Sequence, residues 1–594
     1  MCGIIGYIGK ENCLPIILNG LKALEYRGYD SAGIAYNINN ETKIVKEKGK
    51  ITELEKILPN DYSNIGIGHT RWATHGKPSK INSHPHKVGK ITIVHNGIIE
   101  NYQEIKEELK KEKVKFITET DTEVACALIN YYYEKTNNIE RSIILAKEKL
   151  IGSYAIGLMV DGENKIYAFR KQSPLILGVG DNEYFIASDI PAFLEYTNKY
   201  MLLEESEFAI LNNDKIIIQK IISKNETKTV KKQILTFDFP RDVAKKGGYS
   251  HFMLKEINEE PNVCENLVNI LKENDFSSLP DIKKYNTIDI VACGSAYHAG
   301  MIGKYLIENY LEIPVTVTVA SEYRYQKHIR EKNKLVIAIS QSGETADTIA
   351  SIEIAKEHGY KTIGIVNVIG STISRIVDKV LYIYAGPEIA VATTKAYTLQ
   401  VLMLSLLTYK NAIGNINDKK ILKEYQKLKD EINNLINFDY SSIVDKIYKN
   451  DDMFFIGRLL DYALCLEGSL KLKEISYIHS EAYQAGELKH GTISLIEEGT
   501  PVISIVTDES IKLKTISNIK ETKARGAYVL LIVKEGIEVS DDIYDDKIII
   551  PNNSEFIMPI LTIVPLQLLS FYVALKRGCD IDKPKNLAKS VTVE

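Results

Sequence analysis

Cys2 lies at the start of the chain, between Met1 and Gly3. If Met1 is removed, as a small second residue permits, one residue carries both a thiol and a free α-amine. The thiol can then act as a nucleophile, and the amine, whose ordinary pKa is near ~8, can serve as its general base. A lone cysteine is more often a small buried apolar group, so Cys2 by itself leaves both interpretations open.

Polar residues that follow expected strands supply other groups that such a nucleophile needs. Arg71, within residues 68–76, could bind a carboxylate through two hydrogen bonds. Asn96 and Gly97 could form an oxyanion hole from a side-chain amide and a backbone N–H, although Asn-Gly is also a strong signal for a hairpin turn. Asp121 could bind an ammonium group, or it could cap the helix that follows it.

A different site is indicated by residues 340–345, which read Ser-Gln-Ser-Gly-Glu-Thr. Hydroxyls and backbone N–H groups at a helix N-terminus, after a parallel strand, bind anions, and Gly343 lets the backbone approach closely. The alternative is a cluster that only caps the helix. The residues that we expect to bind a phosphate monoester are Ser340, Gln341, Ser342 and Thr345.

Four further residues could carry proton transfer or imine chemistry. Lys471 and Glu474 share a helix face, where such a pair is usually a weak surface ion pair but could also be a carboxylate base beside a cation that stabilises an enolate. His490, in a glycine-flanked loop, could shuttle protons or only pack. Lys589, in the apolar C-terminal segment 586–594, could form a Schiff base with a sugar carbonyl or could be solvated.

The elements that must position these residues change in kind along the chain. Residues 2–213 alternate short β-rich runs with polar turns and contain two helical patterns, which predicts a sandwich of sheets and helices. Residues 214–250 become polar and basic and contain Pro240 and a Gly-Gly pair, so we expect a linker there.

After the expected linker, the pattern becomes strand, loop and helix, which predicts doubly wound parallel sheets in an α/β domain. This pattern occurs twice, over residues 265–420 and 445–585, so we infer an internal duplication. In the second copy the loop that corresponds to residues 340–345 contains Asp508 and Glu509, which would repel a phosphate. We therefore expect one phosphate site, in the first copy.

Composition excludes several functional classes. The net charge of −4 argues against a nucleic-acid-binding protein. The seven cysteines contain no C-x-x-C pair, which favours the reducing cytoplasm over a disulfide framework or a zinc ribbon. Residues 557–575 are uncharged and nearly long enough to span a membrane, but they contain two prolines, so we expect a buried helix and no membrane association. No basic segment of a signal peptide opens the chain.

Several strings along the chain carry a resemblance to one family. In order they are CGIIGYIG, YRGYDSAG, GHTRWATHG, HNGIIENY, SQSGETADT, KLKEISYIHSEAYQAGELKHG and NLAKSVTVE. Together they resemble the glutamine–fructose-6-phosphate aminotransferase family from Cys2 to Glu594. The first part is similar to class-II glutamine amidotransferases of the N-terminal nucleophile type, and the second part is similar to paired sugar isomerase (SIS) domains. The implied fold is an α/β/β/α sandwich followed by two flavodoxin-like halves.

The resemblance implies that the chain converts fructose 6-phosphate and glutamine into glucosamine 6-phosphate and glutamate, the first step of amino-sugar synthesis for cell-wall precursors. Cys2 would attack the glutamine carboxamide and form a γ-glutamyl thioester, with Asn96 and Gly97 as the oxyanion hole. Arg71 and Asp121 would bind the glutamine carboxylate and amine.

The remaining implied residues of the glutamine site belong to the string around Arg71. Trp72, the only tryptophan in the chain, resembles the family's gate for an interior channel that carries ammonia to the sugar site. Thr74 and His75 are implied substrate contacts.

At the sugar site, the resemblance implies that residues 340–345 bind phosphate and that Lys589 forms a Schiff base at C2. Glu474, with Lys471 beside it, would move a proton between C2 and C1. His490 would open the sugar ring from a neighbouring subunit, which requires a homodimer or a higher homo-oligomer. No metal, nucleotide or flavin cofactor is required. Further implied substrate contacts are Ser295, Val391 and Ala588.

The chain departs from the family at three places, of which one is conservative, since Thr393 stands where a Ser is common. Where the family often has Cys-Gly-Thr-Ser after the first SIS strand, this chain has Ser295 and Ala296 in the last two positions. A hydroxyl that can contact the phosphate is missing at Ala296, so we expect weaker substrate binding with the chemistry retained. The linker lacks the insertion of eukaryotic members, so we expect no inhibition by UDP-N-acetylglucosamine.

Two alternatives remain at this point. Another class-II amidotransferase would need nucleotide or pyrophosphate motifs, which the chain lacks. A SIS-type sugar-phosphate isomerase, deglycase or sensor would carry a vestigial glutaminase domain and would have no use for Cys2.

Overall fold

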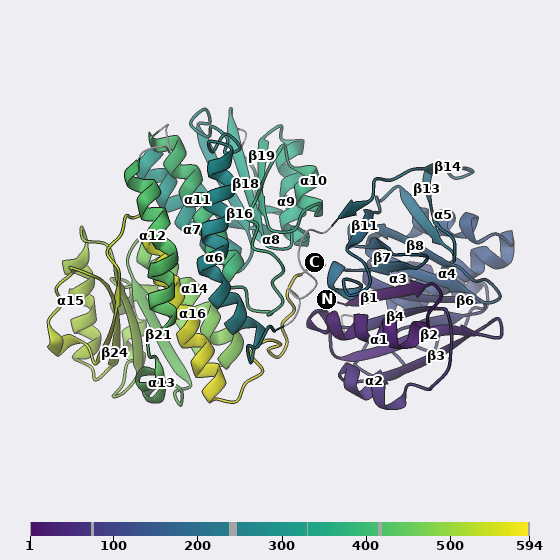
Figure 1. Cartoon of the computed structure of the whole chain (residues 1–594), viewed down its shortest axis with the longest axis horizontal. Coiled ribbons are helices and arrows are strands. Elements are labelled where there is room, and N and C mark those ends of the chain that lie inside the picture. Colours follow the sequence, from purple (N-terminus) through teal and green to yellow (C-terminus); the bar gives the residue numbers. More distant parts are fainter. Residues whose placement is uncertain (1, 73–75, 237–245, 330, 414–418, 592–594) are drawn as a thin grey trace. The chain divides into compact units, whose positions relative to one another are not determined.

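The computed structural model describes residues 2–72, 76–236, 246–329, 331–413 and 419–591. They form two compact units (Figure 1). The first unit contains Met1–Ala244 together with Ser590–Glu594, and the second contains Lys245–Lys589.

The first unit is built on two antiparallel sheets. One has the strand order β15-β11-β9-β10-β1-β4-β2-β3, and the other has the order β14-β13-β12-β8-β7-β6-β5. Their strands are β1 (Gly3–Ile8), β2 (Ser31–Ile38), β3 (Glu41–Lys48), β4 (Ile65–Arg71), β5 (His86–Val88), β6 (Ile91–Ile99), β7 (Gly152–Val160), β8 (Ile166–Lys171), β9 (Ile176–Val179), β10 (Tyr184–Ala187), β11 (Lys199–Leu202), β12 (Glu207–Leu211), β13 (Ile216–Ser223), β14 (Glu226–Val230) and β15 (Leu235–Thr236).

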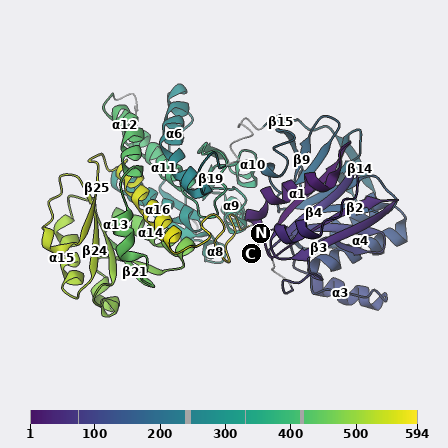
Figure 2. The ribbon, with the colours of Figure 1, turned by 60° about the horizontal axis from the view of Figure 1, so that its bottom comes forward.

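An apolar core lies between the two sheets of the first unit. Val94 of β6 belongs to this core together with Ile4 of β1, whereas its neighbour Ile93 belongs to a second core under helix α4. Successive residues of a strand point to opposite faces, so both faces of this sheet are buried. The expected α/β/β/α sandwich is confirmed. Helices α1 and α2 cover one sheet, and α4, flanked by α3 and α5, covers the other (Figure 1; α1, α3 and α4 are also labelled in Figure 2). The bounds of these helices are α1 (Cys13–Ala23), α2 (Ile51–Ile57), α3 (Tyr102–Lys111), α4 (Asp121–Thr136) and α5 (Ile139–Lys149).

The prediction of a linker over residues 214–250 is wrong for the residues that form β13 and β14. β13 pairs with β12 and with β14, so both strands belong to the edge of the second sheet. β14 is exposed at most of its positions and rich in Thr and Lys. Polar residues protect an edge strand from pairing with other chains, and they give it the composition of a linker. Residues 237–245 of the expected linker lie outside the described residues.

The second unit contains two five-stranded parallel sheets with the same topology. Their orders are β17-β16-β18-β19-β20 and β22-β21-β23-β24-β25, so the expected pair of doubly wound halves is confirmed. The strands are β16 (Thr287–Ala292), β17 (Val315–Val319), β18 (Lys334–Ser340), β19 (Lys361–Val366), β20 (Lys379–Tyr382), β21 (Asp452–Gly457), β22 (His479–Gln484), β23 (Pro501–Val506), β24 (Tyr528–Lys534) and β25 (Asp546–Ile550).

Helices from both halves meet between these two sheets, where one continuous apolar cluster joins them (Figure 1). The helices of this layer are α6 (Phe252–Glu273), α7 (Ser295–Leu311), α11 (Lys395–Ile413), α12 (Lys419–Ile436), α14 (Leu460–Ser476) and α16 (Met558–Lys576). The remaining helices of the unit are α8 (Ala320–Tyr323), α9 (Ala346–Glu357), α10 (Thr372–Ile376), α13 (Ser441–Ile447) and α15 (Lys512–Lys523).

Helix α16 contains most of the uncharged segment that resembles a membrane span. Among the described residues it is the one helix long and apolar enough to cross a membrane, and 89% of its most apolar stretch is buried inside the structure. The expected buried helix is confirmed. Pro565 lies inside the helix, not in a turn before it.

Buried histidine rings form a stack within the first unit. The ring centroids of His69 and His84 are 4.0 Å apart, and those of His84 and His86 are 4.9 Å apart. Burial lowers the pKa of His69 to about 3 and lowers the pKa of His84 and of His86 well below the ordinary range. All three rings are therefore neutral in the folded protein at neutral pH.

This stack predicts that mild acid destabilises the first unit. Unfolded histidines titrate near ~6.5, so below that pH the unfolded chain binds more protons than the folded one. The free energy of unfolding should then fall by up to ~1.4 kcal/mol per pH unit for each buried ring. Scanning calorimetry between about pH 7.5 and about pH 5 measures this fall.

Two variants sharpen the test. His84→Gln should make the pH dependence shallower, whereas His479→Gln, at an exposed position, should not change it. A pH dependence that is equal in all three proteins would contradict the prediction.

Candidate active sites

The pairing of β1 with β4 places Cys2 beside Trp72. Gly3 is opposite Thr70 in this ladder, and just beyond the last pair of the ladder the Trp72 N–H donates a hydrogen bond to Cys2 Sγ at 3.3 Å. The Asn96 Nδ2 donates to the Cys2 carbonyl at 2.9 Å. Strands β1 and β4 of one sheet and β6 of the other therefore meet at Cys2.

The Cys2 thiol is not a spontaneous thiolate here. Burial raises its pKa, and the Trp72 N–H and the Arg71 guanidinium offset the effect only in part. A thiol that is protonated at neutral pH needs a general base before it can attack a carbonyl carbon.

Asn96 and Gly97 lie inside β6 and pair with Ala155 and Tyr154 of β7. The hairpin-turn alternative is therefore wrong for these residues. Gly97 has a φ of 116°, and a Cβ there would lie 1.9 Å from the Ser153 carbonyl oxygen. Only glycine fits this position, which follows Asn96 in β6.

Arg71 and Asp121 lie in the same region. Both charges act on the pKa of the Cys2 thiol, Arg71 by lowering it and Asp121 by raising it. Asp121 is the first residue of α4, while Thr120 caps that helix by accepting from the Glu123 N–H. The capping alternative for Asp121 is therefore wrong, and its Oδ2 accepts from the backbone N–H of Ile99 at 2.9 Å.

The other expected residues of the glutamine site are Trp72, Thr74 and His75. The Trp72 ring is half-buried and contacts the Tyr29 ring edge-on at 5.7 Å. Thr74 and His75 lie outside the described residues. Arg27, which is not among the expected site residues, donates from its Nε to the Cys2 carbonyl at 3.3 Å, and its Nη1 pairs with Asp189 at 3.1 Å. Its signal was the string YRGYDSAG, which contains Arg27.

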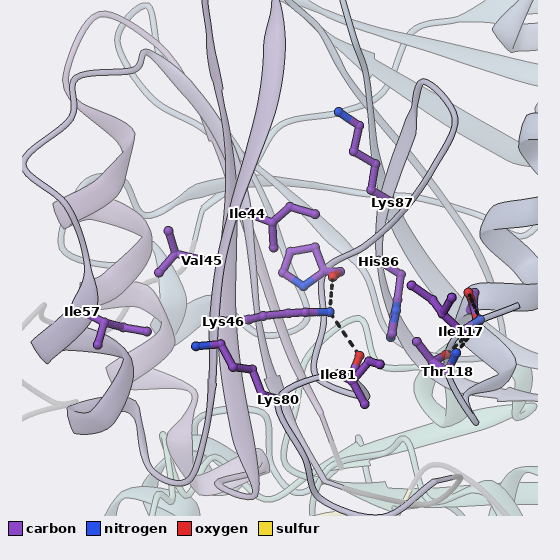
Figure 3. Close-up of a pocket in the computed structure, with 12 residues that line it drawn as sticks. Ile44, Val45, Lys46, Ile57, Lys80, Ile81, His86, Lys87, Ile117 and Thr118 are labelled. Carbon is purple, nitrogen blue, oxygen red and sulfur yellow. Dashed lines mark hydrogen bonds between the residues drawn. The ribbon is translucent and has the colours of Figure 1, made fainter.

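A surface pocket of about 450 Å³ in the first unit has none of the expected site residues among its lining residues (Figure 3). Lys46 on its wall donates to the carbonyls of Ile81 and Pro85, both at 3.2 Å. Lys80 and Lys87 pair with acidic side chains. These cations are satisfied within the protein, so the pocket gives no reason to expect an anionic ligand.

The expected phosphate loop follows β18 and precedes α9 in the second unit. The Ser340 and Thr345 hydroxyl oxygens are 2.8 Å apart, and the Gly343 N–H donates to Ser340 Oγ at 3.0 Å. Thr345 occupies the N-cap position of α9 but makes no side-chain capping hydrogen bond. The hydroxyls of the loop therefore bond to the loop itself, and the alternative of a cluster that only caps the helix is wrong.

Glu344 and the strand order fix the position of this loop. Both oxygens of the Glu344 carboxylate accept from Thr372, from its N–H at 2.7 Å and from its hydroxyl at 2.8 Å. Ser295 begins α7 directly after β16. β16 and β18 are the neighbouring strands at which the order of the sheet reverses, and ligands of such folds bind outside the carboxyl ends of these strands.

The equivalent crevice of the second half contains a carboxylate of the protein itself. Asp461, buried at the start of α14, accepts from the Thr507 N–H at 2.9 Å and from the Thr507 hydroxyl. Burial raises the pKa of Asp461 to about 6. An internal carboxylate takes the donors that would otherwise face an anion, which adds to the repulsion expected from Asp508 and Glu509.

Lys471 is buried on α14, so the alternative of a surface ion pair is wrong. Its Nζ lies 2.6 Å from the Glu474 carboxylate and 3.5 Å from that of Glu467. Burial lowers the pKa of Lys471, but Glu474 and Glu467 more than offset this and the pKa is raised. Glu467, which the sequence analysis missed, also contacts the His298 ring nitrogen at 2.8 Å.

The C-terminal segment is held at a second buried ion pair. Lys589 Nζ lies 2.5 Å from Glu388 Oε2, and the two side chains are 5% and 0% exposed. The solvated alternative for Lys589 is wrong. Ala588 beside it is half-buried, and the Val391 N–H donates to the carbonyl of Asp582 at 3.0 Å.

The carboxylate of Asp582 ties this segment to another helix. It accepts from the backbone N–H groups of Phe252 and Met253, at 2.9 and 3.0 Å, at the start of α6. Two N–H groups that a helix N-terminus leaves without an internal partner are thereby satisfied.

His490 is not brought to these residues. It is exposed at the end of the 3-10 turn Leu488–His490, and no hydrogen bond or ion pair among the described residues joins its ring to Glu474, Lys471 or Lys589.

Comparisons with known proteins address the whole chain. A model of a glutamine amidotransferase domain matches residues 69–195, and a model of the SIS domain matches residues 281–410 and 446–577. A protein of Clostridium tetani named glutamine–fructose-6-phosphate aminotransferase (isomerizing) is 50% identical over the full length of both chains. The chain belongs to the glutamine–fructose-6-phosphate aminotransferase family.

Other members of this family agree with that assignment. The enzyme of the same name from Staphylococcus aureus is 44% identical over the full length of both chains. A solved structure of the C-terminal domain of glucosamine–fructose-6-phosphate aminotransferase from Francisella tularensis is 36% identical to this chain. It covers 57% of this chain and 99% of that one, with a TM-score of 0.53. The protein is thus an enzyme with an amidotransferase part and two SIS domains.

The phosphate loop predicts a strong effect of Gly343→Ala. A Cβ at Gly343 would lie 2.1 Å from Ser371 Oγ, whereas a Cβ at Gly359 would meet nothing within 4 Å, and both glycines have positive φ. Gly343→Ala should weaken fructose 6-phosphate binding by about 10-fold or more, and the matched control Gly359→Ala by less than about 2-fold. Calorimetric titration measures both affinities, and equal affinities would exclude the loop as the phosphate site.

Proposed function

We propose that this chain transfers the amide nitrogen of glutamine to fructose 6-phosphate and isomerises the product, giving glucosamine 6-phosphate and glutamate. The observation that carries the proposal is the presence of two reactive constellations in one chain. Cys2 lies among an arginine, an amide and a glycine backbone, and Lys589 and Lys471 lie buried beside carboxylates. Free cysteines throughout the described residues support a reducing location, the cytoplasm.

In the glutaminase reaction, Cys2 attacks the carboxamide carbon and ammonia leaves as the γ-glutamyl thioester forms. The α-amine of Cys2 takes the thiol proton once Met1 is removed. Asn96 Nδ2 and the Gly97 N–H stabilise the oxyanion. Arg71 pairs with the carboxylate of glutamine and Asp121 with its ammonium group, so that the carboxamide is the end that faces the thiol.

The other proposed contacts of glutamine are Thr74 and His75, and Trp72 gates the transfer of ammonia. The contact of Trp72 with the half-buried Cys2 supports this role for Trp72, because ammonia must be kept from water on its way to the sugar. Water would protonate it to ammonium, which is not a nucleophile.

In the sugar reaction, the phosphate of fructose 6-phosphate binds Ser340, Gln341, Ser342 and Thr345 at the N-terminus of α9. Lys589 forms an imine with the C2 carbonyl as water leaves. Ammonia then attacks C2 and displaces the Lys589 amine, and the resulting imine makes the C1 hydrogens acidic. Glu474 moves a proton between C1 and C2, and the Lys471 ammonium, 2.6 Å from it, stabilises negative charge on the enolamine. The remaining proposed substrate contacts are Ser295, Val391 and Ala588.

His490 is proposed to open the sugar ring in the site of a neighbouring subunit. Its exposure and its separation from the other sugar-site residues in one chain support this arrangement. The enzyme would then be a homodimer or a higher homo-oligomer, because each sugar site needs two chains.

Replacement of Cys2 tests the glutaminase half. Cys2→Ala should abolish formation of glucosamine 6-phosphate from glutamine, while isomerisation of fructose 6-phosphate to glucose 6-phosphate continues. Product analysis with both substrates and with each alone measures the two activities. The control Cys579→Ala, at a half-buried cysteine outside both sites, should retain both. Synthesis from glutamine by Cys2→Ala would exclude Cys2 as the nucleophile.

Subunit mixing tests the shared site. His490→Ala and Lys589→Ala should each be inactive in synthesis as pure proteins. When the two are co-expressed, one site of each mixed dimer has both residues intact, so about one quarter of the wild-type activity should return. Mixtures that stay inactive would place His490 and Lys589 of one chain in the same site.

A further inference from the structure

Formation of an imine at Lys589 poses a proton problem. The imine requires a neutral amine, but Lys589 Nζ is held 2.5 Å from the Glu388 carboxylate in a pair that is almost fully buried. An ammonium group has no lone pair with which to attack a carbonyl carbon. A nearby group must therefore accept one proton before the C–N bond can form.

Glu388 is the group that reaches this proton. In the part of the chain that the structure describes, it is the one residue recorded in a hydrogen bond or ion pair with Lys589 Nζ. Glu474, the base proposed for the C1–C2 transfer, is bound to Lys471. His490 is exposed and makes no described contact with Lys589.

The Glu388 carboxylate is fixed in orientation by the loop that follows it. Its Oε1 accepts from the backbone N–H groups of Thr394 and Ala396, both at 3.0 Å, and its Oε2 accepts from the Thr393 hydroxyl as well as from Lys589. These bonds leave Oε2 aimed at the amine. A base held in this way is preorganised and does not need to reorient before it accepts the proton.

The electrostatics of the pair favour transfer when a substrate excludes water. Burial by itself would raise the pKa of Glu388, and Lys589 together with the hydroxyl and N–H donors lowers it to about 2. Once the proton moves, the Lys589 charge that holds this pKa down is gone and the effect of burial remains. A neutral amine beside a neutral carboxylic acid is then stabilised relative to two buried ions.

Glu256, whose pKa is raised in part by the charge of Glu388, is not an alternative base for Lys589. Glu256, on α6, accepts from the N–H groups of Ile389 and Ala390 at 2.5 and 3.2 Å. Burial and the charge of Glu388 raise its pKa to about 8, against the opposing charges of Lys589 and Lys395. Glu256 is therefore protonated at neutral pH and leaves Glu388 as the ionised partner of Lys589.

We infer that Glu388 is a catalytic residue that accepts the proton of Lys589 and returns it to the departing oxygen of the sugar. The inference rests on the proposed role of Lys589 as the imine-forming amine. Glu388 removes one proton from the ammonium, and the amine attacks C2 as the C=O π bond breaks. Glu388 protonates the oxygen, takes a second proton from nitrogen, and gives it to the hydroxyl, which leaves as water. The products are a protonated imine and an ionised Glu388 beside it.

Borohydride trapping measures this step directly. The full-length protein is mixed with fructose 6-phosphate without glutamine and quenched with sodium borohydride at increasing times. Mass spectrometry then measures the fraction of the Lys589 peptide that carries the reduced sugar adduct. Glu388→Gln keeps the size of the side chain and one oxygen acceptor for the loop, but it cannot take a proton. We expect its trapping rate to fall by about 100-fold or more.

Glu260→Gln is the matched control. Glu260 lies on α6, is buried, and accepts from the Thr398 hydroxyl at 3.1 Å, and burial raises its pKa to about 8. It is thus already neutral at neutral pH and has no recorded contact with Lys589 among the described residues. Its glutamine variant should trap the imine within about 3-fold of the wild-type rate.

Added formate separates a chemical role from a structural one. Formate should restore part of the trapping rate of Glu388→Ala, because this variant leaves space in which a small carboxylate can replace the lost proton carrier. A variant that is slow only because its loop has collapsed does not respond to formate. Failure of rescue, or trapping by Glu388→Gln at the wild-type rate, would overturn the inference. If the wild-type protein itself gives no adduct at Lys589, the proposed role of Lys589 fails instead.

Discussion

Charges that leave water must be paired, because an isolated buried ion costs several kcal/mol, and this constraint organises the second unit. Three buried lysines, Lys395, Lys471 and Lys589, each have a glutamate partner at 2.5–2.6 Å. The pairing fixes every side chain in position before any sugar is bound. It also leaves each lysine proton on a short path to a carboxylate, so the interactions that stabilise the fold are those that can move protons.

In the first unit, by contrast, several of the buried polar groups near Cys2 are neutral. Burial raises the pKa of the Cys2 thiol, the buried histidine rings are neutral, and the Asn96 amide donates to the carbonyl of Cys2 itself. Such groups stabilise negative charge only when it develops. One chain therefore combines a site in which neutral N–H donors and a thiol lie near the charges of Arg71 and Asp121 with a site in which buried lysines are paired with carboxylates.

Local patterns were enough to predict most of the fold. The two doubly wound halves expected after the linker are present as the sheets β16–β20 and β21–β25, because hydrophobic periodicity and turn residues are local properties. The edge hairpin β13–β14 was missed because its polar surface has the composition of a linker. Glu388 was missed for another reason: it belongs to no motif, and 201 residues separate it from Lys589. Only the folded chain brings such partners together.

The attachment of α6 has a consequence for how the protein is made. The N-terminal turn of this helix is capped by Asp582, a residue 330 positions further along the chain. During synthesis the ribosome releases α6 long before it releases Asp582. The second unit therefore cannot complete its packing until Asp582 has emerged, and until then water must satisfy the first N–H groups of α6. Completion of the sugar site thus depends on the arrival of the same short segment that contains Lys589.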